Sequence, residues 1–142
     1  MYTTILVPVD ISEDKLTAKA LRHVEKLAEF SQAKVHFFYA IYDISAYVGE
    51  RGLIPLVSRD DIEKHSKLSL EEMIKNVNIP SDRVTCSVSF GAARDSVLEL
   101  AQEIGADLIV VGSRRPSVTT YLLGSNASAI VRHAMTSVLV VR

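Results

Sequence analysis

Only one cysteine, Cys86, occurs in the 142 residues, so the chain cannot close an internal disulfide and a reducing compartment is expected. The 16 Lys and Arg residues are balanced by 17 Asp and Glu residues, and no basic run offers a surface for nucleic acid. No apolar run approaches the length of a membrane span, so no membrane partner is expected. A strand pattern begins at once, without a leader, which predicts a cytoplasmic protein.

Several glycine patterns that bind nucleotides or carry nucleophiles are absent. The dinucleotide fingerprint G-x-G-x-x-G would follow the first strand, where the chain reads PVDIS. Neither the phosphate loop G-x-x-x-x-G-K-[ST] nor the nucleophile elbow G-x-S-x-G occurs. Phe90 and Gly91 stand where a phospho-acceptor domain would carry an aspartate. These absences argue against four common classes of α/β protein.

Metal-binding and thiol chemistry find little support either. The four histidines, His23, His36, His65 and His133, include no pair at metal-ligand spacing, so no metal site is expected. Cys86 lies on the apolar face of an alternating strand, which predicts an unreactive core residue rather than an exposed thiolate.

Strand and helix patterns alternate along the whole chain. Strands are expected at residues 3–7, 34–41, 83–90, 108–111 and 137–141, with four helices between them and an irregular stretch at 42–57. The second helix begins with a capping pattern at Ser58 and Asp61. This α/β order predicts one domain, residues 1–142, with three layers: an open five-stranded parallel sheet, order 3-2-1-4-5, between helices.

Two patterns make finer predictions about burial. Residues 83–90 alternate strictly between apolar and hydroxyl side chains, which is typical of a half-exposed strand at a sheet edge. The last helix has an apolar stripe at helical spacing, which predicts burial of Ala127, Ile130, Val131 and Ala134.

Ligands of open parallel sheets bind at the carboxyl ends of the strands. Asp10, Gly91, Gly112 and the 42–57 stretch all come to that edge. Gly124 and Ser125 open the last helix, whose free N–H groups attract anions, phosphate above all. Arg114 and Arg115 precede that helix and could neutralise charge. Two plainer interpretations stay open: an ordinary capped helix after the loop, and Asp10 as a turn residue.

Three separated segments carry a more specific pattern: ILVPVDIS near the start, ADLIVVGS before the loop, and LLGSNASAIVRHAMTSVLVVR at the end. Their wording, order and spacing resemble the universal stress protein family over the whole chain. Within that family the phrase RP…TTYLLGSNA…VRHA is similar to the F and G branch of bacterial members. The resemblance implies an adenine nucleotide α-hydrolase-like fold, bound ATP, with or without Mg²⁺, and a homodimer.

The resemblance also implies roles for individual residues. In ATP-binding members the aspartate after strand one and the glycine after strand four contact the sugar, the end of strand two contacts adenine, and a Gly-Ser pair holds phosphates. The matching residues here are Asp10, Gly112, Ala40, Gly124 and Ser125, with Pro8, Val111, Asn126 and Ala127 close by.

The loop after Gly112 departs from the family pattern. Arg115 stands where a second glycine is expected, and the loop from there to Gly124 is one residue shorter than the pattern. A guanidinium recognises phosphate well, so Arg115 can replace lost backbone contacts with a charged one. The alternative is a solvated Arg115 and weaker nucleotide binding.

These observations predict an ATP-binding regulatory protein of the stress response without strong catalysis. Asp10 is the only acidic residue at the expected cleft, and no clear general base accompanies it. A slow ATPase or phosphotransferase, and a nucleotide-free dimeric interaction module, are the alternatives. Whichever of these functions holds, we expect an apolar strand at the sheet edge, Ser137–Val141. Pairing with the same strand of a second copy would cover it and give a homodimer, or a higher oligomer built on that dimer.

Overall fold

The computed structural model describes residues 1–10, 14–41, 58–113 and 124–142. The strands found there are β1 (Thr4–Pro8), β2 (Lys34–Ile41), β3 (Val84–Phe90), β4 (Leu108–Gly112) and β5 (Ser137–Val141). The helices are α1 (Asp14–Ser31), α3 (Arg59–Ile74), α4 (Ala93–Glu103) and α5 (Ser125–His133), with a single 3₁₀ turn, η1 (Ser81–Arg83), before β3. The elements alternate as the sequence predicts.

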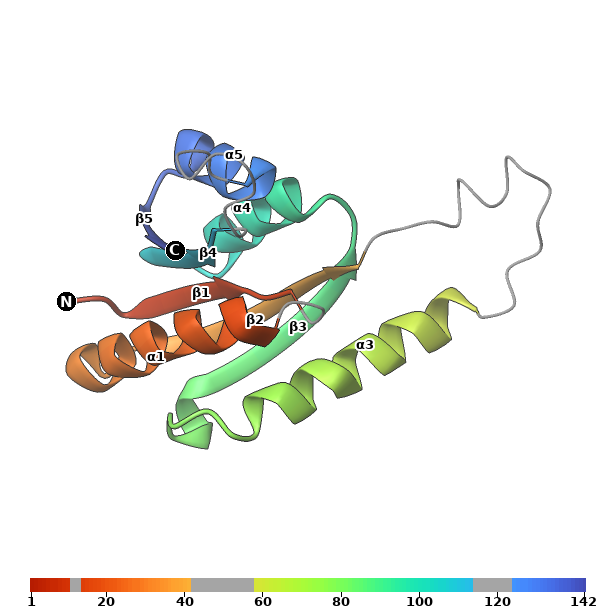
Figure 1. Ribbon diagram of the computed structural model, residues 1–142, viewed down its shortest axis with the longest axis horizontal. Helices are drawn as coiled ribbons and strands as arrows, with labels where there is room; N and C mark the ends of the chain where they lie inside the picture. Colours follow the sequence, from red (N-terminus) through yellow and green to blue (C-terminus); the bar gives the residue numbers. More distant parts are fainter. Residues whose placement is uncertain (11–13, 42–57, 114–123) are drawn as a thin grey trace.

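All paired strands in the described residues run parallel, in the order β3-β2-β1-β4-β5. This confirms the predicted open sheet and places β3 and β5 at its two edges. Helices α4 and α5 cover one face, and α1 and α3 cover the other, which gives the three layers (Figure 1). All carboxyl ends of the strands therefore meet at one edge, and every helix that follows a strand begins there.

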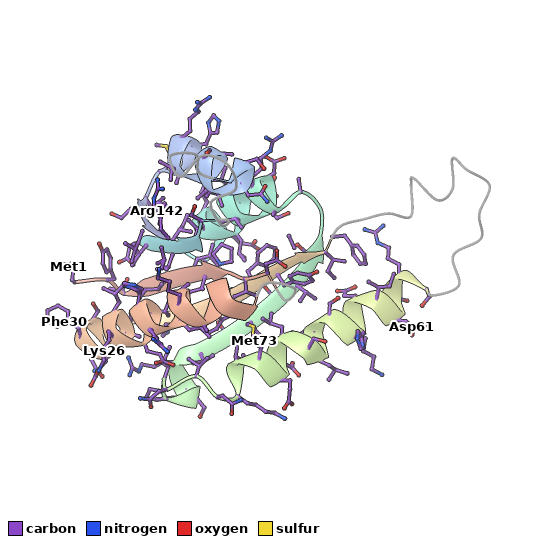
Figure 2. The ribbon with its side chains drawn as sticks, viewed as in Figure 1. Met1, Lys26, Phe30, Asp61, Met73 and Arg142 are labelled. Carbon is purple, nitrogen blue, oxygen red and sulfur yellow. The ribbon has the colours of Figure 1, made fainter. Side chains whose placement is uncertain are left out.

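The face beneath α1 and α3 holds the larger apolar core. Its fully buried side chains come from both helices and from alternate positions of the inner strands, namely Ile5, Val7, Val24, Val35, Phe37, Leu70 and Val110. Met73 packs against this core from the sheet-facing side of α3, whereas Phe30, at the end of α1, projects away from the sheet and is 78% exposed (Figure 2). Burying such side chains stabilises the fold by about 1.5–3 kcal/mol each.

The opposite face of the sheet holds a smaller apolar core. Leu6, Phe38 and Ile109 point from the sheet toward α4 and α5, where Val97 and Ile130 meet them. These residues alternate with those of the first core along each strand, because successive side chains of a strand point to opposite faces. The apolar run in β4 is buried on both sides, as predicted for a central parallel strand.

Polar contacts fasten the amino-end edge of the sheet. Asp107, just before β4, accepts hydrogen bonds from the Thr3 N–H (2.9 Å), the Thr3 hydroxyl (3.0 Å) and the Thr4 N–H (3.0 Å) at the start of β1. The Arg83 guanidinium donates to the Ala28 and Ala33 carbonyls and so satisfies acceptors where α1 ends. This edge is thus held by fixed contacts, whereas the edge at which the sequence predicts a ligand lies at the other end of the strands.

Most local predictions are confirmed. The Ser58 hydroxyl caps α3 by accepting from the Asp61 N–H at 3.1 Å, although α3 ends at Ile74 rather than near Val77. Cys86 packs among apolar residues under α3, and burial raises the pKa of its thiol, which fits an unreactive residue. The irregular stretch at 42–57 lies outside the described residues.

The predicted burial of Val131 is wrong. Ala127 and Ile130 are buried and Ala134 partly so, but Val131 is 46% exposed. Helical spacing placed it on the apolar stripe of α5. Among the described elements, that helix packs mainly against α4 and the edge strand β5. Val131 lies largely outside these contacts.

Candidate functional site

The carboxyl ends of β1, β2 and β4 bring the predicted residues to one place. Pro8 ends β1, and the next residue, Val9, donates its N–H to the Phe38 carbonyl of β2 at 2.8 Å. Gly112 ends β4 and pairs with Val141. The chain leaves β1 and β4, neighbouring strands, at the same edge, although about a hundred residues separate the two points.

A cavity of about 690 Å³ opens at this edge, which is the size of a small-molecule site. Nine of the eleven residues predicted for the site line it: Pro8, Asp10, Ala40, Val111, Gly112, Gly124, Ser125, Asn126 and Ala127. The other two, Arg114 and Arg115, lie outside the described residues. Segments that are far apart in the sequence therefore line one cavity, as the topology predicts.

The floor of the cavity is apolar. Val7, Phe38, Val97, Val111 and Ile130 line it, and each is buried in the sheet or under a helix. An apolar floor with few polar groups above it suits a ligand with a flat, weakly polar part and a charged part.

The start of α5 forms one wall. Gly124 is its N-cap, with φ −60° and ψ 156°, and no side chain of the described residues caps the helix. Ser125 and Asn126 are exposed, and within the described part of the chain no backbone carbonyl accepts from the first N–H groups of α5, which can therefore meet a ligand along the helix dipole. Any residue can adopt the angles of Gly124, so the backbone does not require glycine here. Its lack of a side chain instead permits close approach to the N–H groups.

The start of α4 forms a second wall that sequence reasoning did not include among the site residues. Gly91, Ala92, Ala93 and Arg94 line the same cavity. Gly91 follows β3 directly and donates its N–H to the Ile41 carbonyl at the end of β2, at 3.1 Å. The signal in the sequence was the position of Gly91 after a predicted strand. The sequence does not show that α4 packs over β2 closely enough for its start to reach the site.

Only two of the described lining residues are charged, Asp10 and Arg94. Asp10 has an interaction partner within the protein. No group of three or more metal-binding side chains is found among the described residues. The cavity thus combines an apolar floor, two helix starts, one carboxylate and one guanidinium.

A separate polar cluster lies on the face of β2 and β3, away from the cavity lining. The ring nitrogens of His36 contact the Thr85 hydroxyl at 2.6 Å and the Ser87 hydroxyl at 2.8 Å. Burial, and then the nearby charge of Lys67, lower the pKa of His36, so the ring is neutral near pH 7. Because both ring nitrogens contact hydroxyl groups of β3, this histidine holds the edge strand β3 to β2.

The family model named "Universal stress protein family" matches residues 1–142. The chain belongs to the universal stress protein family. It is 42% identical to universal stress protein G of Escherichia coli O157:H7 over the full length of both chains. It is also 33% identical to universal stress protein A homolog 2 of Coxiella burnetii, over 84% of this chain and 83% of that one.

Solved structures of universal stress proteins share the fold. The protein UspA from Lactobacillus plantarum aligns with a TM-score of 0.75 at 24% identity, covering 99% of this chain and 98% of that one. A universal stress protein in complex with cAMP aligns at 0.66 and 26% identity, covering 99% and 97%. One from Archaeoglobus fulgidus in complex with dAMP aligns at 0.69 and 20% identity, covering 99% and 98%.

No helix among the described residues has both the length and the apolar composition needed to cross a membrane.

Proposed function

We propose that this universal stress protein binds an adenine nucleotide, ATP in particular, in the cavity at the carboxyl edge of its sheet, and acts as a cytoplasmic regulator in the stress response. The observation that carries the proposal is the α5 start, which presents free N–H groups to that cavity behind a residue without a side chain. Family members solved with cAMP and with dAMP share the fold and support the choice of adenine.

The arrangement of the residues suggests a pose. Ala40 at the end of β2 offers backbone groups to the adenine, and Asp10 with Gly112 lies beside the sugar. Gly124, Ser125 and Asn126 hold the phosphates through backbone N–H groups and the helix dipole. Where Mg²⁺ accompanies ATP, it would be held mainly by phosphate oxygens and water, as this ion usually is.

We further propose that the protein turns ATP over slowly at most. Within the described lining, Asp10 is the only carboxylate, and the pose uses it on the sugar. The Ser87–His36 pair lies outside the cavity lining and cannot serve as nucleophile and base for a ligand there. Phosphate release should fall far below the roughly 10 per second of a typical enzyme. Release at ordinary enzyme rates that Asp10→Asn stops would favour an ATPase or phosphotransferase instead.

We also propose a homodimer through β5. This strand lies at the sheet edge and holds the apolar residues Val138, Leu139, Val140 and Val141, the first three only partly buried. Met135, just before it, is 88% exposed. An exposed edge of this kind promotes association unless it is covered. Antiparallel pairing with β5 of a second copy about a two-fold axis would satisfy its free backbone groups.

Titration calorimetry on graded variants tests the nucleotide site. We expect micromolar ATP affinity, on the order of −8 kcal/mol, reduced in Gly124→Ala and lost in Gly124→Val because the added methyl groups block the phosphate. Both variants should fold, since the angles of Gly124 suit any residue. Ser81→Val, at the opposite edge of the sheet, is the control and should bind as the wild type does. No heat from the wild type with ATP and Mg²⁺, or full binding by Gly124→Val, would overturn the proposal.

A further inference from the structure

The cavity has two distinct ends because the strands are arranged side by side. Gly112 and the α5 start lie on the β4 side of β1, where the proposed pose places phosphate. Ala40 lies on β2, on the other side of β1, and α4 packs over β2. Two strand spacings, about 10 Å, separate β2 from β4. Although α4 also packs against α5, its start follows β3, on the far side of β2 from β4, so the α4 wall lies at the β2 end of the cavity, away from Gly124.

Arg94 is the one cation among the described residues that line the cavity, and it stands on this α4 wall. No hydrogen bond or ion pair engages its guanidinium within the described part of the chain. It occupies the second position of α4, where a positive charge meets the positive end of the helix dipole. Helix stability therefore does not explain an arginine here, whereas Asp95, the next residue, suits that position.

We propose that Arg94 reads the base of the bound nucleotide, its guanidinium plane covering one face of a purine seated against Ala40. This inference rests on the proposed nucleotide site and adds a residue that selects the base. The planar, weakly hydrated guanidinium stacks on aromatic rings, and the ring is attracted to its charge. Val97, one turn further along α4, and Phe38 form the apolar floor below. A purine would then lie between this floor and the guanidinium.

The choice of ligand and the salt dependence distinguish stacking on the base from phosphate binding. A residue that reads phosphate should affect ATP more than adenosine, and its effect should weaken with salt. A residue that stacks on the base should affect both ligands equally and depend little on salt. It should also favour purine over pyrimidine nucleotides, because the larger ring system offers more area for stacking.

The test measures adenosine, ATP and CTP affinity for Arg94→Ala, Arg94→Lys and the control Lys34→Ala. Lys34 is exposed at the start of β2, about 20 Å from Ala40 along the strand, and its replacement removes the same charge. Arg94→Ala should weaken adenosine and ATP by the same factor, about two- to thirty-fold, and narrow the preference for ATP over CTP. Arg94→Lys should restore binding only in part, because an ammonium keeps the charge over the ring but lacks the stacking plane, and Lys34→Ala should change nothing.

Each other result contradicts the inference in a recognisable way. A loss confined to ATP, or restoration by lysine of ATP binding alone, would make Arg94 a phosphate contact. Unchanged affinities in Arg94→Ala would remove it from the site and leave the nucleotide proposal standing. Wild-type protein that binds neither adenosine nor ATP would overturn the proposed function and this inference together. Arg94→Ala should fold at least as well as the wild type, since alanine is the better helix former and the unfavourable charge is gone.

Discussion

Asp107 fastens the start of β1 to the start of β4, and its replacement is the sharpest test of how the amino-end edge is held. The carboxylate accepts from two backbone N–H groups and one hydroxyl, all on Thr3 and Thr4. Asp107→Ala would leave these three donors without their partner. Asp107→Asn would keep the shape and one acceptor oxygen but remove the charge.

The magnitude follows from the exposure of the contacts. A hydrogen bond to a charged group contributes about 1.5–3 kcal/mol where water is excluded. Asp107 is only partly buried and Thr3 faces water, so water takes over much of the lost bonding. We expect Asp107→Ala to lower the free energy of unfolding by about 1–2 kcal/mol. For a domain of this size that lowers Tm by roughly 3–7 °C.

The stability contributed by Asp107 should depend on pH in one direction. Partial burial acts to raise the pKa of Asp107, but the hydrogen bonds from Thr3 and Thr4 outweigh it and lower the pKa below the usual value. The charged form is thus stabilised in the folded protein. Its contribution is fully present above the unfolded pKa of about 3.9 and is lost as pH falls through the folded pKa.

Calorimetric or circular dichroism melts of wild type and Asp107→Asn check this. The gap in Tm should be constant near neutral pH and should close as pH falls below about 4. Glu72→Gln is the matched control, since it removes a carboxylate from an exposed pair with Lys75, and it should leave Tm unchanged. A gap that persists at low pH, or one absent at pH 7, would refute the reasoning.

Three further predictions concern other parts of the fold. Gly91 has φ +143°, and an added Cβ would lie 3.0 Å from the Ser96 hydroxyl oxygen, so Gly91→Ala should cost about 1–3 kcal/mol in denaturant unfolding; an unchanged midpoint would contradict this. Because burial lowers the pKa of His36, the stability of the wild type should fall as pH drops below about 6.5. In thermal melts over that pH range, the Tm of His36→Gln should fall less than that of the wild type. Leu139→Pro should convert the proposed β5 dimer to monomer or aggregate by light scattering, and a monomeric intact chain at micromolar concentration would exclude the dimer.

The strand order and most helix positions were predictable because they depend on local patterns. A few consecutive residues are enough to indicate each feature: the burial of β4 by its apolar run, the edge position of β3 by its alternation, and the start of α3 by the Ser58 cap. Parallel connections with one handedness then leave few ways to assemble the elements. The exposure of Val131 could not be read, since helical spacing shows which residues share a face but not how much of that face a neighbour covers.

The site was predictable only in part for a similar reason. Pro8 and Gly112 end strands and Asp10 comes two residues after β1, so their meeting at one edge follows from the topology. The α4 wall, including Arg94, depends on how far a helix leans over the sheet, and no local pattern encodes that distance. Arg114 and Arg115 lie outside the described residues, so their role at the phosphates stays a prediction.

The central claim is that an adenine nucleotide occupies the cavity between the α4 and α5 starts. Native mass spectrometry of the protein, purified under mild conditions and then incubated with excess ATP, tests it most directly, with Gly124→Val alongside. We expect a wild-type species heavier by one adenine nucleotide per chain and a variant that carries none. Wild-type protein that shows no bound nucleotide, or a variant that retains it equally, would contradict nucleotide binding at this site.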